Sequence, residues 1–133
     1  MTKKNLSPNK TTINNSCSNS RNINKMRGNN AEQLALVYLQ NKGLKLIKQN
    51  FYSRLGEIDL IMQENNTTIF VEVKLRNTLD NAIISITKHK QQKLFKTAKY
   101  YLMKLGYEVA CRFDAVCIDN NGNCQWLQNI IQF

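Results

Sequence analysis

The pattern of apolar and polar positions predicts two helices and five strands. Apolar residues recur at helical spacing near residues 30–42 and 88–105, and five shorter stretches have the alternating or continuous apolar pattern of strands. The expected strands are Leu44–Tyr52, Leu55–Gln63, Thr68–Leu75, Cys111–Ile118 and Cys124–Ile131. The order α-β-β-β-α-β-β predicts a mixed α/β domain.

The two helices carry recognisable boundary residues. Asn29 or Asn30 can cap the first helix and Gly43 ends it, while Thr87 caps the second and Gly106 ends it. The first helix is expected to bury the stripe at i, i+3, i+4 and i+7, namely Ala31, Leu34, Ala35 and Tyr38.

A tight turn at Asn65-Asn66 predicts a β-hairpin with a defined register, because asparagine tolerates positive φ. One face of this hairpin is entirely apolar, which supports the register, since a slip of one residue would mix the faces. That face carries Ile58, Leu60 and Met62 against Val73, Val71 and Ile69.

The opposite face places Asp59 across from Glu72 and Glu57 across from Lys74. Directly opposed carboxylates have Cβ atoms about 4.5–5.5 Å apart and repel each other. A divalent cation would remove this conflict, and Mg²⁺ is often held by one or two carboxylates. Lys74 could then stabilise phosphoryl charge or position water. The alternative is a solvated strand with an ordinary Glu57–Lys74 salt bridge.

Length and charge indicate one basic domain with an N-terminal tail. The 133 residues suffice for a single core, and the formal net charge of +10 suits an anionic partner. Residues 1–27 contain six basic and no acidic residues and are rich in Asn and Ser, so we expect a disordered tail there and a folded domain over 28–133.

No apolar run is long enough to span a bilayer, and the first residues do not resemble a signal peptide, so we expect a cytoplasmic protein without membrane contact. The four cysteines form no CxxC pair and are expected to be reduced packing residues.

Three lysines at the start of the second helix, Lys88, Lys90 and Lys93, are candidate nucleic-acid contacts. Cations in the first turn oppose the helix dipole, which a bound phosphate would offset. They could equally form a solvated face. Arg112 and Asp114 share a strand face and are expected to form a structural ion pair.

The two strands of the hairpin carry two linked motifs, Gly56-Glu-Ile-Asp-Leu-Ile61 and Phe70-Val-Glu-Val-Lys74, with Arg76 following. Together these motifs resemble the YraN-like family of small bacterial proteins, which is similar to restriction-endonuclease-like nucleases and Holliday-junction resolvases. The resemblance covers about residues 27–131. It implies a restriction-endonuclease-like αβββαβ core, with a mixed central sheet flanked by helices.

The resemblance also implies a catalytic set. Asp59, Glu72 and Lys74 match its D…ExK positions, with Asp59 and Glu72 as ligands of Mg²⁺ or Mn²⁺. Glu32 matches a first-helix glutamate that completes the metal site in related nucleases, although at a helix start it could serve only the helix dipole.

These observations lead to the hypothesis of a metal-dependent endonuclease acting on DNA. The resolvase-like relatives imply branched DNA among the substrates and, by analogy, a homodimer. The alternatives are a nucleic-acid-binding module of the same fold with little or no cleavage, and a basic scaffold for acidic proteins or lipid head groups.

Overall fold

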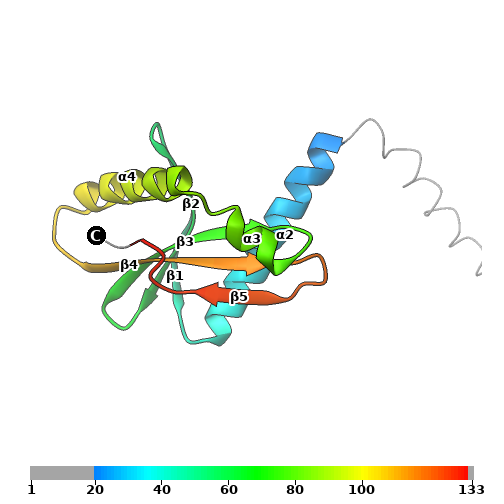
Figure 1. Ribbon diagram of the computed structural model, residues 1–133. Coiled ribbons are helices and arrows are strands. Elements are labelled where there is room, and N and C mark those ends of the chain that lie inside the picture. Colours follow the sequence, from blue (N-terminus) through cyan, green and yellow to red (C-terminus); the bar gives the residue numbers. More distant parts are fainter. Residues whose placement is uncertain (1–19, 132–133) are drawn as a thin grey trace, which may run out of the picture. The chain divides into compact units, whose positions relative to one another are not determined.

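The computed structural model describes residues 20–131, with side chains from residue 29 onward. The described residues from Ala31 onward cluster as one compact unit. Figure 1 shows the elements in sequence colours. They are α2 (Ser20–Asn41), β1 (Lys45–Ser53), β2 (Gly56–Glu64), β3 (Thr67–Leu75), α3 (Leu79–Ile84), α4 (Lys88–Leu105), β4 (Ala110–Ile118) and β5 (Cys124–Leu127).

The strands form one mixed sheet in the order β1-β2-β3-β4-β5. The first three strands and the β4–β5 pair are antiparallel, whereas β3 and β4 are parallel. A parallel neighbour requires a crossover connection, and here α3 and α4 supply it (Figure 1). The predicted mixed α/β fold with an αβββαβ core is therefore confirmed.

The two faces of the sheet carry separate apolar cores. On one face, Leu60 and Val71 pack with the part of α2 that includes Ala35. On the other face, Ile61 and Phe70 pack with residues of α4. Neighbouring residues of one strand point to opposite faces, so this alternation confirms the predicted hairpin register.

Ile58 departs from the predicted face. It packs with the α4-side core, whereas Leu60 packs on the α2 side. The partner strand β1 is irregular: its pairing with β2 shifts register between Leu46 and Lys48, and Asn50, between the paired residues Gln49 and Phe51, has a positive φ of 53°.

Helix α4 has the bounds that its pattern predicts. The Thr87 side chain accepts a hydrogen bond from the Lys90 amide at 3.2 Å, and Gly106 ends the helix with a left-handed φ of 78°. Gly56 fixes the distance between α4 and the start of β2, because a Cβ built on it would lie 3.0 Å from Oγ1 of Thr97. This close approach places the first turns of α4 over one end of the hairpin.

The start of the first helix differs from the prediction. Helix α2 begins at Ser20 rather than near Asn30, so neither Asn29 nor Asn30 caps it. Helices extend more easily than they nucleate, and no proline interrupts residues 20–30. The remainder of the expected tail, residues 1–19, lies outside the described residues.

Three smaller predictions are wrong. Leu34 is 48% exposed, because α2 buries a stripe shifted toward Leu36 and Leu39. The short helix α3 was not predicted, since its six residues are too few to show a helical period. Strand β5 ends at Leu127, and Asn129 there adopts a positive φ of 59° that interrupts the strand.

Candidate metal centre

The β2–β3 ladder ends one residue before the predicted carboxylate pair. Paired residues run from Glu64 and Thr67 to Leu60 and Val71. Beyond that point, Oδ2 of Asp59 accepts a hydrogen bond from the amide of Val73 at 2.8 Å. The aspartate side chain thus takes the place of a backbone acceptor where the two strands stop pairing.

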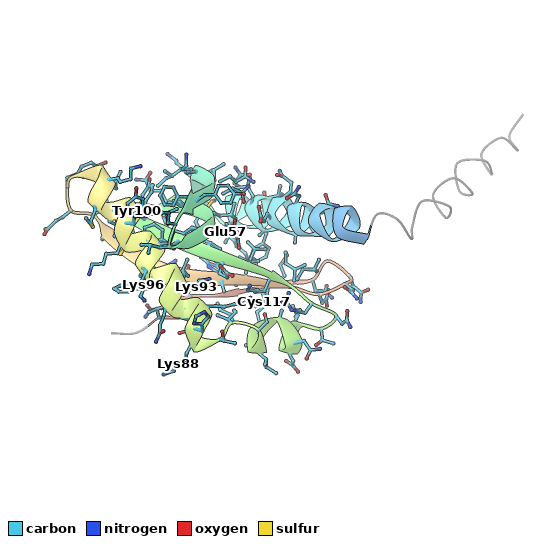
Figure 2. All side chains as sticks on the ribbon, turned by 90° about the horizontal axis from the view of Figure 1, so that it is seen from above. Glu57, Lys88, Lys93, Lys96, Tyr100 and Cys117 are labelled. Carbon is cyan, nitrogen blue, oxygen red and sulfur yellow. The ribbon has the colours of Figure 1, made fainter. Side chains whose placement is uncertain are left out.

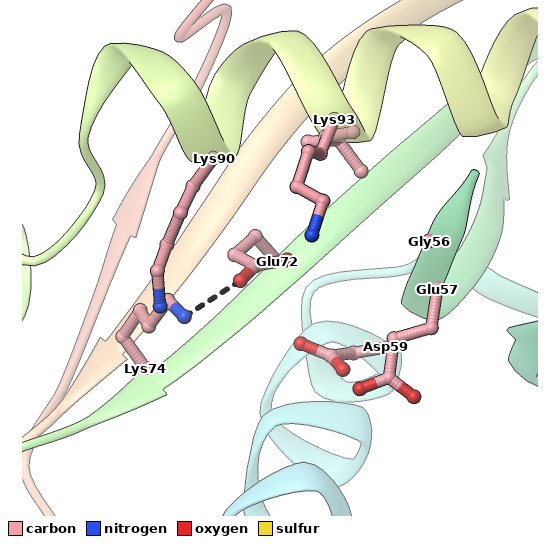
Figure 3. A pocket seen from close by; sticks show the side chains of 8 residues that line it. Gly56, Glu57, Asp59, Glu72, Lys74, Lys90 and Lys93 are labelled. Carbon is pink, nitrogen blue, oxygen red and sulfur yellow. Dashed lines mark ion pairs between the residues drawn. The ribbon is translucent and has the colours of Figure 1, made fainter.

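The polar side chains of this end of the hairpin line a cavity of about 250 Å³ beneath α4 (Figure 3). Strands β2 and β3 contribute the carboxylates, and α4 contributes lysines from above. The lining residues are Gly56, Glu57, Asp59, Glu72, Lys74, Lys90, Lys93 and Leu94. The structure therefore brings Asp59, Glu72 and Lys74 together on one face, as the hairpin pattern predicts.

Asp59 has the most strongly shifted pKa among the acids that line the cavity. Only 8% of the residue is exposed. Burial and, next, the charge of Glu72 raise its pKa, the hydrogen bond from Val73 only partly opposes them, and the net result is a pKa of about 8. At neutral pH and without a cation, the carboxyl group of Asp59 is therefore largely protonated.

Glu32 of α2 interacts with this group from the neighbouring helix, although it is not among the residues that line the cavity. Burial raises its pKa, and the charge of Glu57 adds to the effect. The side chains of Asn50 and Asp59 hydrogen-bond Glu32 and act in the opposite direction. Helix α2 thus adds a third acid near the Asp59–Glu72 pair.

Asn50 is a site residue that the sequence pattern did not reveal. It belongs to β1, its φ is positive, and its side chain hydrogen-bonds Glu32. A non-glycine residue with positive φ inside a strand is uncommon and often marks a functional site. An asparagine within an otherwise regular strand pattern was the only available signal.

Lys74 pairs with Glu72 rather than with Glu57. Its Nζ lies 2.8 Å from Oε2 of Glu72, and Figure 3 shows this ion pair as a dashed line. Burial lowers the pKa of Lys74, but the charge and hydrogen bond of Glu72 outweigh burial, so the pKa is raised. The predicted alternative, a Glu57–Lys74 salt bridge, is therefore wrong.

Of the three candidate lysines in α4, Lys90 and Lys93 line the cavity and Lys88 does not. The close contact with Lys74 lowers the pKa of Lys90. Two ammonium groups this close repel each other, and a bound anion would offset that repulsion. The lysines thus place positive charge in the same cavity as the buried acid Asp59.

Within residues 29–131, no three acidic, histidine or cysteine side chains converge as a ready-made metal cage. Mg²⁺ does not require one, because one or two carboxylates commonly bind it together with waters and substrate phosphates. Asp59 and Glu72 fit this donor chemistry. Since Glu72 is engaged with Lys74, a cation held by both carboxylates would compete with Lys74 for Glu72.

A second buried ion pair lies away from the cavity and has a structural role. Asp114 is fully buried and accepts hydrogen bonds from Arg112, the Trp126 indole and the amide of Asn129. Arg112 also bonds Glu64. This network links β4 to the chain after β5, and it confirms the predicted structural pairing of Arg112 with Asp114.

The described cysteines are all free thiols, as expected from the sequence. Cys117 is buried, and burial raises its pKa to about 11, so it is an unreactive packing residue. Cys111 and Cys124 also form no disulfide, and Cys17 lies outside the described residues.

In the part of the chain that the structure describes, no helix is both long and apolar enough to cross a bilayer.

Comparison with known proteins agrees with the resemblance found in the motifs. Residues 31–118 match the uncharacterised protein family UPF0102. A UPF0102 protein of Psychromonas ingrahamii is 50% identical over 105 residues, covering 77% of this chain and 86% of the relative. Relatives from Nitrosomonas eutropha and Legionella pneumophila are each 44% identical, over 79% and 77% of this chain and 92% of their own lengths. The chain therefore belongs to the UPF0102 family.

Proposed function

We propose that this protein is a divalent-metal-dependent nuclease that hydrolyses phosphodiester bonds in DNA. The observation that carries the proposal is the position of Asp59: a nearly buried acid, fixed by the Val73 amide, within a cavity that also holds Glu72 and Lys74. A buried carboxyl group with a raised pKa, set beside a second acid and a lysine in a cavity, is typical of functional sites, and this supports a ligand-binding role for the arrangement.

Asp59 and Glu72 would hold Mg²⁺ or Mn²⁺, and Glu32 would orient Asp59 from α2. When bound, the cation would lower the pKa of water and neutralise charge on the phosphoryl oxygens. Lys74, released from Glu72, would donate to a phosphoryl oxygen as negative charge develops there. Lys90 and Lys93 would hold the neighbouring phosphates at the cavity mouth.

A cleavage assay on branched, nicked, single-stranded and duplex DNA with Mg²⁺ or Mn²⁺ tests this proposal. Asp59→Asn and Lys74→Met should each lower the rate by at least about 100-fold. Asp80→Asn is the matched control, since Asp80 is an exposed carboxylate in the first turn of α3. If the wild type shows no turnover, or if turnover survives in both cavity variants, the proposal fails.

The absence of a three-ligand cage within residues 29–131 favours one alternative, a nucleic-acid-binding module that cleaves little or not at all. Such a protein would bind DNA with a strong salt dependence, because lysine–phosphate contacts release counterions. It would do so equally well with EDTA and with Mg²⁺. DNA binding that does not depend on a metal ion, without cleavage of any of the tested DNAs, would decide in favour of this alternative.

A further inference from the structure

The charged side chains of helix α4 are all of one sign, which the metal centre alone does not explain. Its 18 residues include six lysines and no acidic residue, and neither of the first two lysines is favoured by the helix dipole. The lysines are Lys88, Lys90, Lys93, Lys96, Lys99 and Lys104. Soluble helices usually mix both signs of charge, so this composition indicates a polyanionic partner that extends along the helix.

Three of these lysines form a continuous stripe together with Tyr100. Lys93, Lys96, Tyr100 and Lys104 follow the spacing i, i+3, i+7 and i+11, which places them on one helix face. Figure 2 shows Lys93, Lys96 and Tyr100 in succession along α4. Lys93 lines the cavity, and at 1.5 Å per residue the stripe continues for about 16 Å away from it.

Tyr100 is the aromatic member of the α4 stripe, and its ring is partly held in place. It is 39% exposed, its centroid lies 6.3 Å from that of Phe51, and Nζ of Lys104 lies 5.4 Å from its centroid. An exposed aromatic ring among lysines matches the sites at which single-stranded nucleic acids stack a base and pair its phosphates.

The depth of the cavity favours single-stranded DNA over duplex DNA as its ligand. Asp59 is 8% exposed beneath the lysines of α4, so a phosphate has to enter the cavity to approach it. A phosphate of a stacked duplex is held on a wide, stiff cylinder, whereas an unpaired strand can bend into the cavity. Its bases are also free to stack on Tyr100, which paired bases are not.

The geometry points to an unpaired DNA strand as the ligand of the α4 stripe, with phosphates on Lys93 and Lys96 and a base on Tyr100. This inference rests on the proposed function, because it names the substrate of the same cavity. The substrate class would then be DNA with single-stranded segments, such as flaps, gaps or the open centre of a junction.

Binding of fluorescent oligo(dT), with a hairpin duplex of equal length as comparison, tests the inference. The full chain is used with Ca²⁺, and without turnover, so that the result does not depend on cleavage. Tyr100→Leu should weaken oligo(dT) binding about ten-fold, and Tyr100→Trp should restore it. Lys96→Gln should lower the slope of log affinity against log salt by about 0.7, the value for one single-strand phosphate.

Lys42→Gln is the matched control. Lys42 lies over the Tyr38 ring at 5.3 Å, much as Lys104 lies over Tyr100, but it directly follows α2, the helix that packs on the other face of the sheet. We expect its oligo(dT) affinity to equal that of the wild type, and we expect all variants to bind the hairpin within two-fold of it.

Unchanged oligo(dT) binding in Tyr100→Leu and Lys96→Gln would overturn the inference, as would equal losses for oligo(dT) and hairpin. The two proposals fail separately. If the variants lose affinity for oligo(dT) alone and no DNA is cleaved, the α4 stripe is upheld as a single-strand binding site and the nuclease proposal fails. If DNA is cleaved and Tyr100→Leu binds oligo(dT) like the wild type, the nuclease proposal is upheld and the role of the α4 stripe fails.

Discussion

Replacing Asp59 with asparagine should remove a pH-dependent loss of stability from the metal-free protein. Folding raises the pKa of Asp59 from an ordinary 3.8 to about 8. Between these values the folded protein holds a proton that the unfolded chain releases, so stability falls as the pH rises. The contribution of this group is complete below about pH 4 and is lost by about pH 8.

The size of the effect follows from the linkage relation. One proton held only by the folded state changes the free energy of unfolding by roughly 1.4 kcal/mol per pH unit. The wild type should therefore lose roughly 3 kcal/mol between pH 5 and pH 7 through Asp59 alone. Asparagine has the same shape, its amide oxygen can accept the Val73 hydrogen bond, and it does not titrate, so the variant should not show this loss.

Urea unfolding in EDTA measures the difference, with the fluorescence of Trp126, the one tryptophan of the chain, as the probe. The m-value should stay constant, which makes the midpoint a measure of stability. Asp80→Asn, an exposed carboxylate, should follow the wild type. If the wild type and Asp59→Asn change in parallel with pH, the buried-acid reasoning is refuted.

The remaining predictions concern the metal, the ion pair, the glycine and the second acid network. Mn²⁺ at 100 times its Kd should stabilise the wild type by about 2.7 kcal/mol in a thermal melt and leave Asp59→Asn unchanged; equal shifts would contradict an Asp59 ligand. Lys74→Met should free Glu72 and tighten Mn²⁺ binding about ten-fold by calorimetry while cleavage falls, and weaker binding would count against their competition. Gly56→Ala should cost about 1–3 kcal/mol in urea unfolding, because Gly56 has a φ of +149° and a close neighbour in α4, and a neutral substitution would show that α4 can shift. Asp114→Asn should cost about 3 kcal/mol, since it breaks a buried ion pair, and it should leave metal binding intact.

The local pattern of apolar and polar residues determined much of the fold and of the candidate site. The alternation in β2 and β3 placed Leu60 and Val71 on one face and Asp59 and Glu72 on the other, because side chains in a strand alternate with a period of two residues. Capping residues fixed α4 at Lys88–Leu105 for a similarly local reason. Such features depend on residues that are close in the sequence, so the sequence itself carries them.

Contacts between distant segments were decided only by the tertiary structure. Strand periodicity could not show that the ladder stops before Asp59, that Val73 donates to its carboxylate, or that Glu72 pairs with Lys74. Asn50 combines a positive φ with a hydrogen bond to Glu32 of α2, a contact between residues far apart in the sequence. Each of these features depends on how the separately predicted elements pack in three dimensions, which no local pattern of residues specifies.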